Sequence, residues 1–125
     1  MPALDNRFLD AALNKLRDEA TDIFVCSADP GLDFNLATHV YALASYSPPP
    51  FGPNEDRPGG GRRISITPFV GGAWTANGPG AFWALVDLPS ERVLESGPLS
   101  PTTAGVIGQS VRLDAAFYPL SLPGV

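Results

Sequence analysis

The clearest pattern in the chain is an amphipathic stripe near its start, which predicts a helix over residues 5–20. Asp5 precedes the stripe and is a suitable N-cap, because its carboxylate accepts from free backbone N–H groups and favours the positive end of the helix dipole. We therefore expect an N-terminal helix that packs its apolar face on the rest of the core. The apolar positions recur every three to four residues, as on one face of an α-helix: Phe8, Leu9, Ala12, Leu13, Leu16 and Ala20.

Shorter apolar runs follow, and most of them indicate β-strands. Residues 22–26 form a β-branched run that is typical of a buried strand. Residues 32–46 fit either a helix or a strand, and we expect a short helical piece to about His39 followed by a strand near residues 41–45. Residues 63–67 alternate apolar and polar side chains, which favours a half-buried strand.

The second half of the chain predicts a series of antiparallel strands. Residues 73–76 and 81–87 flank Asn77-Gly78-Pro79-Gly80, a combination typical of a β-hairpin. A turn at residues 88–91 leads to a further strand, and a Pro/Gly/Thr-rich stretch then precedes a last apolar run at residues 111–117. We expect antiparallel strands across residues 63–117 and a mainly β fold: a small antiparallel β-sandwich with the N-terminal helix packed on it.

Residues 47–62 are rich in proline and glycine and predict a long loop. Pro48, Pro49 and Pro50 lack backbone N–H donors, and three successive glycines follow at residues 59–61, so neither a helix nor a strand ladder is expected here. The start of the loop is expected to be stiff polyproline II, and its end flexible. Residues 118–125 form an extended apolar tail. With 125 residues, the chain fits a single domain over residues 1–125.

Charge and composition exclude several classes of partner. Thirteen acidic and eight basic residues give a net charge of −5, which argues against nucleic acid and anionic lipid because both require a positive surface. No apolar run approaches the roughly 18 residues of a membrane span, and the first residues lack the pattern of a secretory signal. One cysteine and one histidine supply neither an intramolecular disulfide nor a His/Cys zinc site, so we expect no cofactor.

Candidate catalytic residues are few. His39 is the only possible histidine base, and no Gly-x-Ser-x-Gly turn presents a serine nucleophile. Cys26 lies in an apolar strand without a neighbouring cation, which favours a buried, unreactive thiol. The stretch from Asp29 to Asn35 faintly resembles a calcium loop, but it lacks the terminal bidentate glutamate, and turn chemistry explains the same residues.

Two groups of charged residues are further candidate functional sites. The segment from Arg57 to Arg63 contains three arginines and three glycines, but no strand precedes it and no helix follows it, as a phosphate-binding loop requires. We interpret these arginines as available to pair with acidic groups on a partner. Asp87, Glu91 and Glu95 lie at a turn and a strand edge, where we expect a solvated rim. No catalytic constellation is therefore expected, and the protein is predicted not to be an enzyme.

Aromatic residues supply a further alternative. Because side chains alternate along a strand, Phe82 and Trp83 point to opposite faces, and one of them points away from a core that covers only one face. An outward Trp83 would suit an interface anchor, and either Trp74 or Trp83 would suit a stacking platform for carbohydrate. Coverage by a neighbouring loop or by the helix is the structural alternative.

Several stretches resemble the small virion proteins of tailed bacteriophages. The strand of residues 80–87 ends in Trp83-Ala84-Leu85-Val86-Asp87 and is followed by a Leu-x-x-Gly-x-Leu segment at residues 94–99. Residues 106–113, residues 9–13 with 23–28, and the glycine–arginine pair before the strand near residue 64 also fit that group. The resemblance spans most of the chain outside residues 47–60 and contains no active-site motif.

This resemblance implies a structural protein located in the virion, most simply a capsid decoration or cement protein that contacts the major capsid protein. A tail- or fibre-associated protein that contacts tail proteins is the alternative, and a carbohydrate-binding adhesion module is a third possibility. Self-association is expected, since a cement protein orders many copies on a lattice. The expected contact residues lie in the proline-rich loop, at Trp83 and in the tail: Pro48, Pro49, Pro50, Phe51, Arg57, Arg62, Trp83, Tyr118, Leu120 and Leu122.

Overall fold

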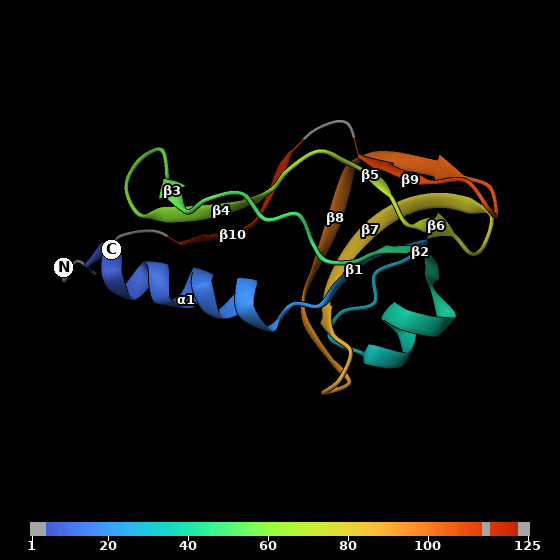
Figure 1. The fold of residues 1–125 in the computed structure, drawn as a ribbon, viewed down its shortest axis with the longest axis horizontal. Coiled ribbons are helices and arrows are strands. Elements are labelled where there is room, and N and C mark those ends of the chain that lie inside the picture. The colour runs from blue at the N-terminus through green and yellow to red at the C-terminus, as the bar shows by residue number, and fades with distance from the viewer. Residues whose placement is uncertain (1–4, 114–115, 123–125) are drawn as a thin grey trace.

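The computed structural model describes residues 5–113 and 116–122, and it shows an elongated molecule with two parts (Figure 1). One part, which we call the arm, contains the N-terminal helix and a three-stranded sheet. The other part, the body, contains a five-stranded sheet, a short helical segment and a two-stranded ribbon. The predicted mainly β fold with one N-terminal helix and packed antiparallel sheets is confirmed.

The elements follow one another with short connections. Their bounds are α1 Asn6–Glu19, β1 Asp22–Cys26, η1 Leu36–Val40, β2 Ala42–Tyr46, β3 Glu55–Asp56, β4 Arg62–Ile66, β5 Phe69–Gly71, β6 Ala73–Trp74, β7 Gly78–Asp87, β8 Arg92–Gly105, β9 Val111–Leu113 and β10 Phe117–Leu122. The strand order is β6-β2-β1-β7-β8 in the body sheet and β10-β4-β3 in the arm sheet, and β5 pairs with β9.

Helix α1 forms where the sequence predicts it. The side chain of Asp5 caps it by accepting a hydrogen bond from Arg7 N at 2.8 Å. Leu9, Leu13 and Leu16 are buried, as expected of the apolar stripe, and α1 packs on β4. Phe8, which we also placed on that stripe, is 67% exposed, because it lies on the flank of the helix and not on the side that faces the arm sheet.

The body sheet is buried on both faces. Along β7, Trp83 and Leu85 join the main hydrophobic cluster, which also contains Leu13 and Leu16 of α1 and Ile64 and Ile66 of β4. Ala84 and Val86 point to the opposite face and form a second cluster with Cys26, Ala37 and Val93, which η1 covers. Because each face has its own cover, residues 83–87 are buried without interruption, and no residue among them is left facing solvent.

The expected hairpin around residues 77–80 is wrong. Strand β6 pairs with β2, and β7 already begins at Gly78 and pairs with β1 and β8. The turn-forming residues Gly78-Pro79-Gly80 therefore lie in a ladder opposite residues 103–105. A side chain at Gly105 would collide with the ring of Trp74. The absence of a side chain at Gly105 therefore lets β8 pack closely against Trp74 of β6.

Three expectations about irregular segments also need correction. The Pro/Gly/Thr-rich residues 97–105 continue β8. The loop of residues 47–62 contains β3 and a bridge between Phe51 and Ile66. The tail is strand β10 as far as Leu122, paired with β4, and its last residues 123–125 lie outside the described residues. In each case tertiary pairing overrides the local preference of proline and glycine.

The proline-rich segment also explains why β4 is not half-buried. Residues 64–66 are buried in succession, whereas the alternating pattern predicts every second one. The segment lies along β4: Gly52 N donates to Ser65 O at 2.9 Å, and Thr67 N donates to Pro50 O at 2.9 Å. A Cβ at Gly52 would collide with the Ser65 hydroxyl, so the close approach of the proline-rich segment to β4 depends on glycine at this position.

Candidate interaction surfaces

The loop of residues 47–62 is tied to α1 by a polar network. Arg62 pairs with Asp10 at 2.9 Å and with Asp56 at 2.8 Å. These hydrogen bonds raise the pKa of the Arg62 guanidinium above its usual value, and the bond to Asp10 has the larger effect. Arg17 donates to Gly52 O and to Asn54 Oδ1, both at 2.8 Å. The expectation that Arg62 is available for a partner is therefore wrong, because its charge is used within the arm.

We expect the substitution Arg62→Met to loosen this loop while leaving the body intact. It removes the contacts to Asp10 and Asp56, so amide hydrogen exchange should accelerate in residues 52–62. Hydrogen-exchange mass spectrometry measures the effect. Arg7→Met is the matched control, since Arg7 is exposed and contacts only its helix-capping neighbour Asp5 among the contacts described. Equal exchange in both variants would contradict the role of Arg62.

The face of the arm sheet that points away from α1 carries an aromatic and charged cluster. Arg62 and Ile64 face the helix, so strand alternation directs Arg63 to the other side. There the Arg63 guanidinium lies 3.8 Å from the centre of the Tyr118 ring, and Arg63 Nε donates to Glu55 at 2.7 Å. A hydrogen bond from Tyr118 lowers the pKa of Glu55 and raises that of Tyr118.

Arg57 extends this cluster by donating to Ser121 Oγ at 2.9 Å. Two of the expected contact residues, Arg57 and Tyr118, thus lie on one surface, which we call the Tyr118 face. Tyr118 remains exposed, and the Arg63 guanidinium packs on one face of its ring. Tyrosine and arginine are enriched in binding hot spots, so this face suits a protein contact.

Apart from Pro48, the other expected contact residues in the loop and the tail are buried or half-buried. Pro48 is exposed, but Pro49 is buried, and Phe51 packs against the main cluster. Leu120 and Leu122 are half-buried on the same cluster. The proline-rich loop and the tail therefore lie along β4 as far as Leu122, and they do not project from the arm to reach a partner.

Trp83 is buried, so its expected role as an outward anchor or carbohydrate platform is wrong. Its Nε1 donates to Pro98 O at 3.1 Å, and its ring centre lies 5.2 Å from that of Phe117 on β10. A Cβ at Gly97 would press on the same ring. Trp74 is buried as well. The ring of Trp83 is covered by strand β10, and not by a loop or by the helix as the structural alternative expected.

The catalytic candidates do not converge. His39 is exposed on η1, with Nδ1 2.9 Å from Thr38 Oγ1. Cys26 is buried, and burial raises its pKa to about 11, so the thiol is unreactive near neutral pH. Asp29 Oδ1 accepts from Gly31 N, and Asp33 Oδ1 accepts from Leu36 N, as in ordinary turns and helix starts. Among the described residues, no three His, Cys, Asp or Glu side chains gather where they would hold a metal ion.

The expectation that Glu95 lies on a solvated rim is wrong. It is half-buried, its Oε2 is buried without a hydrogen-bond partner, and burial raises its pKa to about 7. Asp87, also expected on a solvated rim, is buried 3.6 Å from Arg92. Glu95 points inward because of a β-bulge. The register of β8 against β7 shifts at Leu94, so Glu95 pairs with Leu85, whose side chain faces the main cluster.

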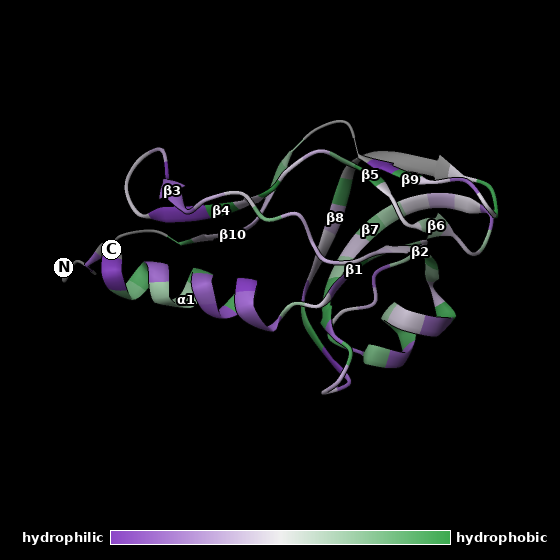
Figure 2. Cartoon of the chain, viewed as in Figure 1, coloured by the Kyte–Doolittle hydropathy of each residue, from purple (hydrophilic) through white to green (hydrophobic). Residues whose placement is uncertain are grey.

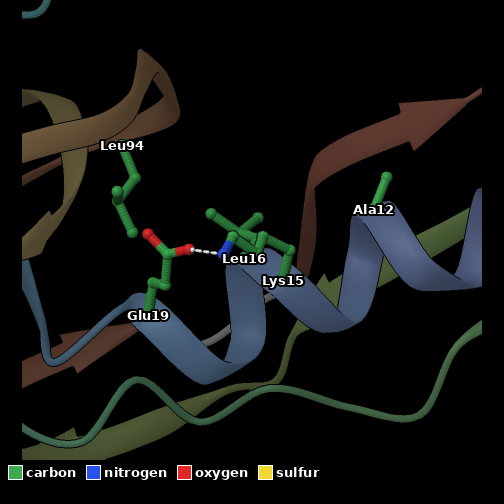
Figure 3. A pocket seen from close by; sticks show the side chains of 5 residues that line it. All are labelled: Ala12, Lys15, Leu16, Glu19 and Leu94. Carbon is green, nitrogen blue, oxygen red and sulfur yellow. Dashed lines mark ion pairs between the residues drawn. The ribbon is translucent and has the colours of Figure 1, made fainter.

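A shallow apolar notch lies between α1 and β8, as Figure 3 shows. It holds about 200 Å³, is open to solvent, and its walls are almost entirely carbon. An ion pair of 2.8 Å between Lys15 Nζ and Glu19 Oε2 lies at its edge, and this hydrogen bond raises the pKa of Lys15. We call it the helix notch; its lining residues are Ala12, Lys15, Leu16, Glu19 and Leu94.

The turn between β8 and β9 presents a second apolar feature, at the far end of the body (Figure 2). Val106 and Ile107 are 54% and 62% exposed, although their backbone is firmly held. Val106 N donates to Gln109 Oε1 at 3.1 Å, and Ile107 N donates to Asn77 Oδ1 at 2.8 Å. Gly108 N donates to Trp74 O at 2.9 Å. We call this the Ile107 turn.

In residues 5–113 and 116–122, no helix has the length and apolar character needed to cross a membrane. Comparison of the chain with protein-family models, with curated protein sequences and with solved structures finds no match.

Proposed function

We propose that this protein is a non-enzymatic structural protein of a tailed-phage virion, and specifically a capsid decoration protein that binds the major capsid protein and self-associates. The resemblance of its strand and turn residues to small virion proteins is the starting point. The observation that carries the proposal furthest is the Ile107 turn, where two apolar side chains are exposed on a backbone that is already ordered.

The physical argument is preorganisation. Binding that must order a loop loses affinity, whereas a turn held by three neighbouring residues is already in a single conformation. Apolar side chains that are exposed on such a turn do not contribute to the core of the monomer, and they are typical of a contact site. The Tyr118 face offers a second rigid surface at the arm, so one copy has the means to contact two neighbours on a shell.

Two alternatives differ in their support. A tail- or fibre-associated role uses the same surfaces and is separated from capsid decoration only by experiment. The carbohydrate-binding alternative relied on Trp74 or Trp83 as a platform, and both rings are buried. Of the Phe, Tyr and Trp side chains described, Phe8 and Tyr118 are exposed, and the Arg63 guanidinium already occupies one face of the Tyr118 ring.

Rebinding to shells tests the proposal. We expect purified protein to co-sediment with expanded capsid shells that lack it and to raise their melting temperature, because a ligand of the native state stabilises it. Replacing both Val106 and Ile107 by Ser should weaken binding by about tenfold or more through lost apolar burial. Val40→Ser, on η1, is the matched control, since Val40 is 60% exposed on another part of the body.

The possible outcomes separate the alternatives. Binding to isolated tails but not to shells would assign the protein to the tail. Binding to neither would overturn the structural role. Equal loss of shell binding in the Val40→Ser control would exclude the Ile107 turn as the contact.

A further inference from the structure

We infer that α1 is a self-association element, on which Phe8 of one copy enters the helix notch of a second copy and receives that copy's Phe8 in return. The inference specifies the self-association that the proposed function requires, and it rests on that function for its biological role. The partner is a second copy of this chain because the two complementary features, an exposed ring and an apolar notch open to solvent, lie on the same helix.

The two features lie in line along α1. Phe8, Ala12 and Leu16 are spaced four residues apart, which places them along one side of a helix. Phe8 is the most exposed aromatic side chain among those described, and Leu16 with Ala12 forms a wall of the helix notch. At a rise of 1.5 Å per residue, Phe8 and Leu16 are about 12 Å apart along the axis.

This spacing fits a two-fold axis through Ala12. If two α1 helices pack antiparallel around that point, Phe8 of each copy lies opposite Leu16 of the other, and Ala12 lies opposite itself. The small Ala12 side chain permits the usual interaxial distance of about 8–10 Å. A parallel pair would place Phe8 against Phe8 and leave both notches empty. The contact is therefore isologous, and it closes as a dimer.

The size and charge of the helix notch also suit the ring. An apolar cavity of about 150 Å³ accommodates benzene, so a notch of about 200 Å³ has room for a phenyl group. The Lys15 ammonium at its edge is already paired with Glu19, and it adds a favourable cation–aromatic contact to the entering ring. In the antiparallel pair, Glu19 lies opposite Asp5 of the other copy, and the two carboxylates repel each other. The ion pair of 3.2 Å between Glu19 and Arg92 reduces this repulsion.

The contact is expected to be weak in dilute solution. A helix of 14 residues is about 21 Å long, so this interface is smaller than the roughly 800 Å² per partner of stable complexes. Copies held together on a shell have a high effective concentration, which compensates for a small contact area. A chemical cross-link in solution captures such a weak dimer.

Cysteine cross-linking at the two-fold axis tests the inference. In the Ala12→Cys variant the two thiols meet at the axis, within the range of a disulfide, whose Cβ atoms are about 4 Å apart. We expect a disulfide-linked dimer on mild oxidation of the full chain at about 100 µM with oxidised glutathione. The control is Asp18→Cys, exposed on another side of α1. Wild-type Cys26 is buried and gives the background.

A second substitution makes the test specific. Adding Phe8→Ala to Ala12→Cys should reduce the dimer yield by about tenfold, because it removes the ring that fills the helix notch. Circular dichroism of each variant establishes that α1 is retained. The inference is overturned if Ala12→Cys cross-links no better than Asp18→Cys, or if Phe8→Ala leaves the yield unchanged.

This experiment is independent of shell binding. Cross-linking in the absence of shells, together with failed rebinding to shells and tails, would retain the α1 contact and overturn the proposed function. Rebinding to shells without a specific Ala12→Cys dimer would retain the function and overturn the α1 contact.

Discussion

Replacing Leu13 by Ala is expected to lower the free energy of unfolding by about 3–4 kcal/mol. Leu13 is fully buried in the main cluster, which also contains Ile64 of the arm sheet and Leu85 of the body sheet. The substitution removes three side-chain carbon atoms (one methine and two methyl groups) from the buried core and leaves a cavity, and Leu→Ala changes at such sites cost about 2–5 kcal/mol. The midpoint of urea denaturation should fall accordingly.

Leu32→Ala is the matched control for this prediction. It removes the same atoms from a side chain that is 72% exposed, so its effect should remain within about 0.5 kcal/mol. An equal shift of the midpoint in both variants would contradict the assignment of Leu13 to the centre of the shared core. A marked change in the slope of the transition would indicate that the arm and the body unfold separately.

Glu95→Gln is expected to make the protein more stable at pH 8 and to leave its stability nearly unchanged at pH 4. Burial raises the pKa of Glu95 from 4.5 to about 7, so the native state retains a proton that the unfolded chain releases. The contribution of the protonated Glu95 side chain to wild-type stability is therefore fully present below about pH 4.5 and is lost progressively as the pH rises through 7.

The size of this effect is about 2 kcal/mol at pH 8, because the side chain is only half-buried and water screens part of the penalty. Denaturation of both proteins at pH 4, 6 and 8 measures it. Glu91→Gln, in the exposed turn before β8, is the control and should parallel the wild-type protein. A constant difference between Glu95→Gln and wild type at all three pH values would contradict the assignment.

Some of this architecture is predictable from the sequence, and α1 shows why. Its apolar period, its Asp5 cap and the absence of internal glycine or proline are local properties, so the helix and its buried leucines lie where the sequence predicts them. Strand β1 and the helical piece before β2 are also local patterns, and the turn that joins β7 to β8 is a contiguous run of turn residues.

The candidate surfaces were less predictable, because each depends on a partner distant in the sequence. The sequence makes Arg62 available to a partner, but Asp10 of α1 pairs with it because the antiparallel strands β3 and β4 pack next to the helix. The strand pattern leaves open whether Phe82 or Trp83 points outward and makes Trp83 a candidate contact residue, but Phe117 of β10 covers the Trp83 ring. Leu94 joins the helix notch only because β8 passes the end of α1.

By itself, then, the sequence determined the helix, the antiparallel β class and the acidic surface, since periodicity, capping and net charge are properties of neighbouring residues and of composition. The tertiary structure alone decided which strands pair, how the proline-rich segment and residues 117–122 lie, and where Glu95 points. Strand pairing joins residues far apart in the chain, and a single bulge at Leu94 turns the following side chain to the other face of the sheet. Both features depend on contacts between residues that are distant in the sequence, and local sequence patterns do not specify such contacts.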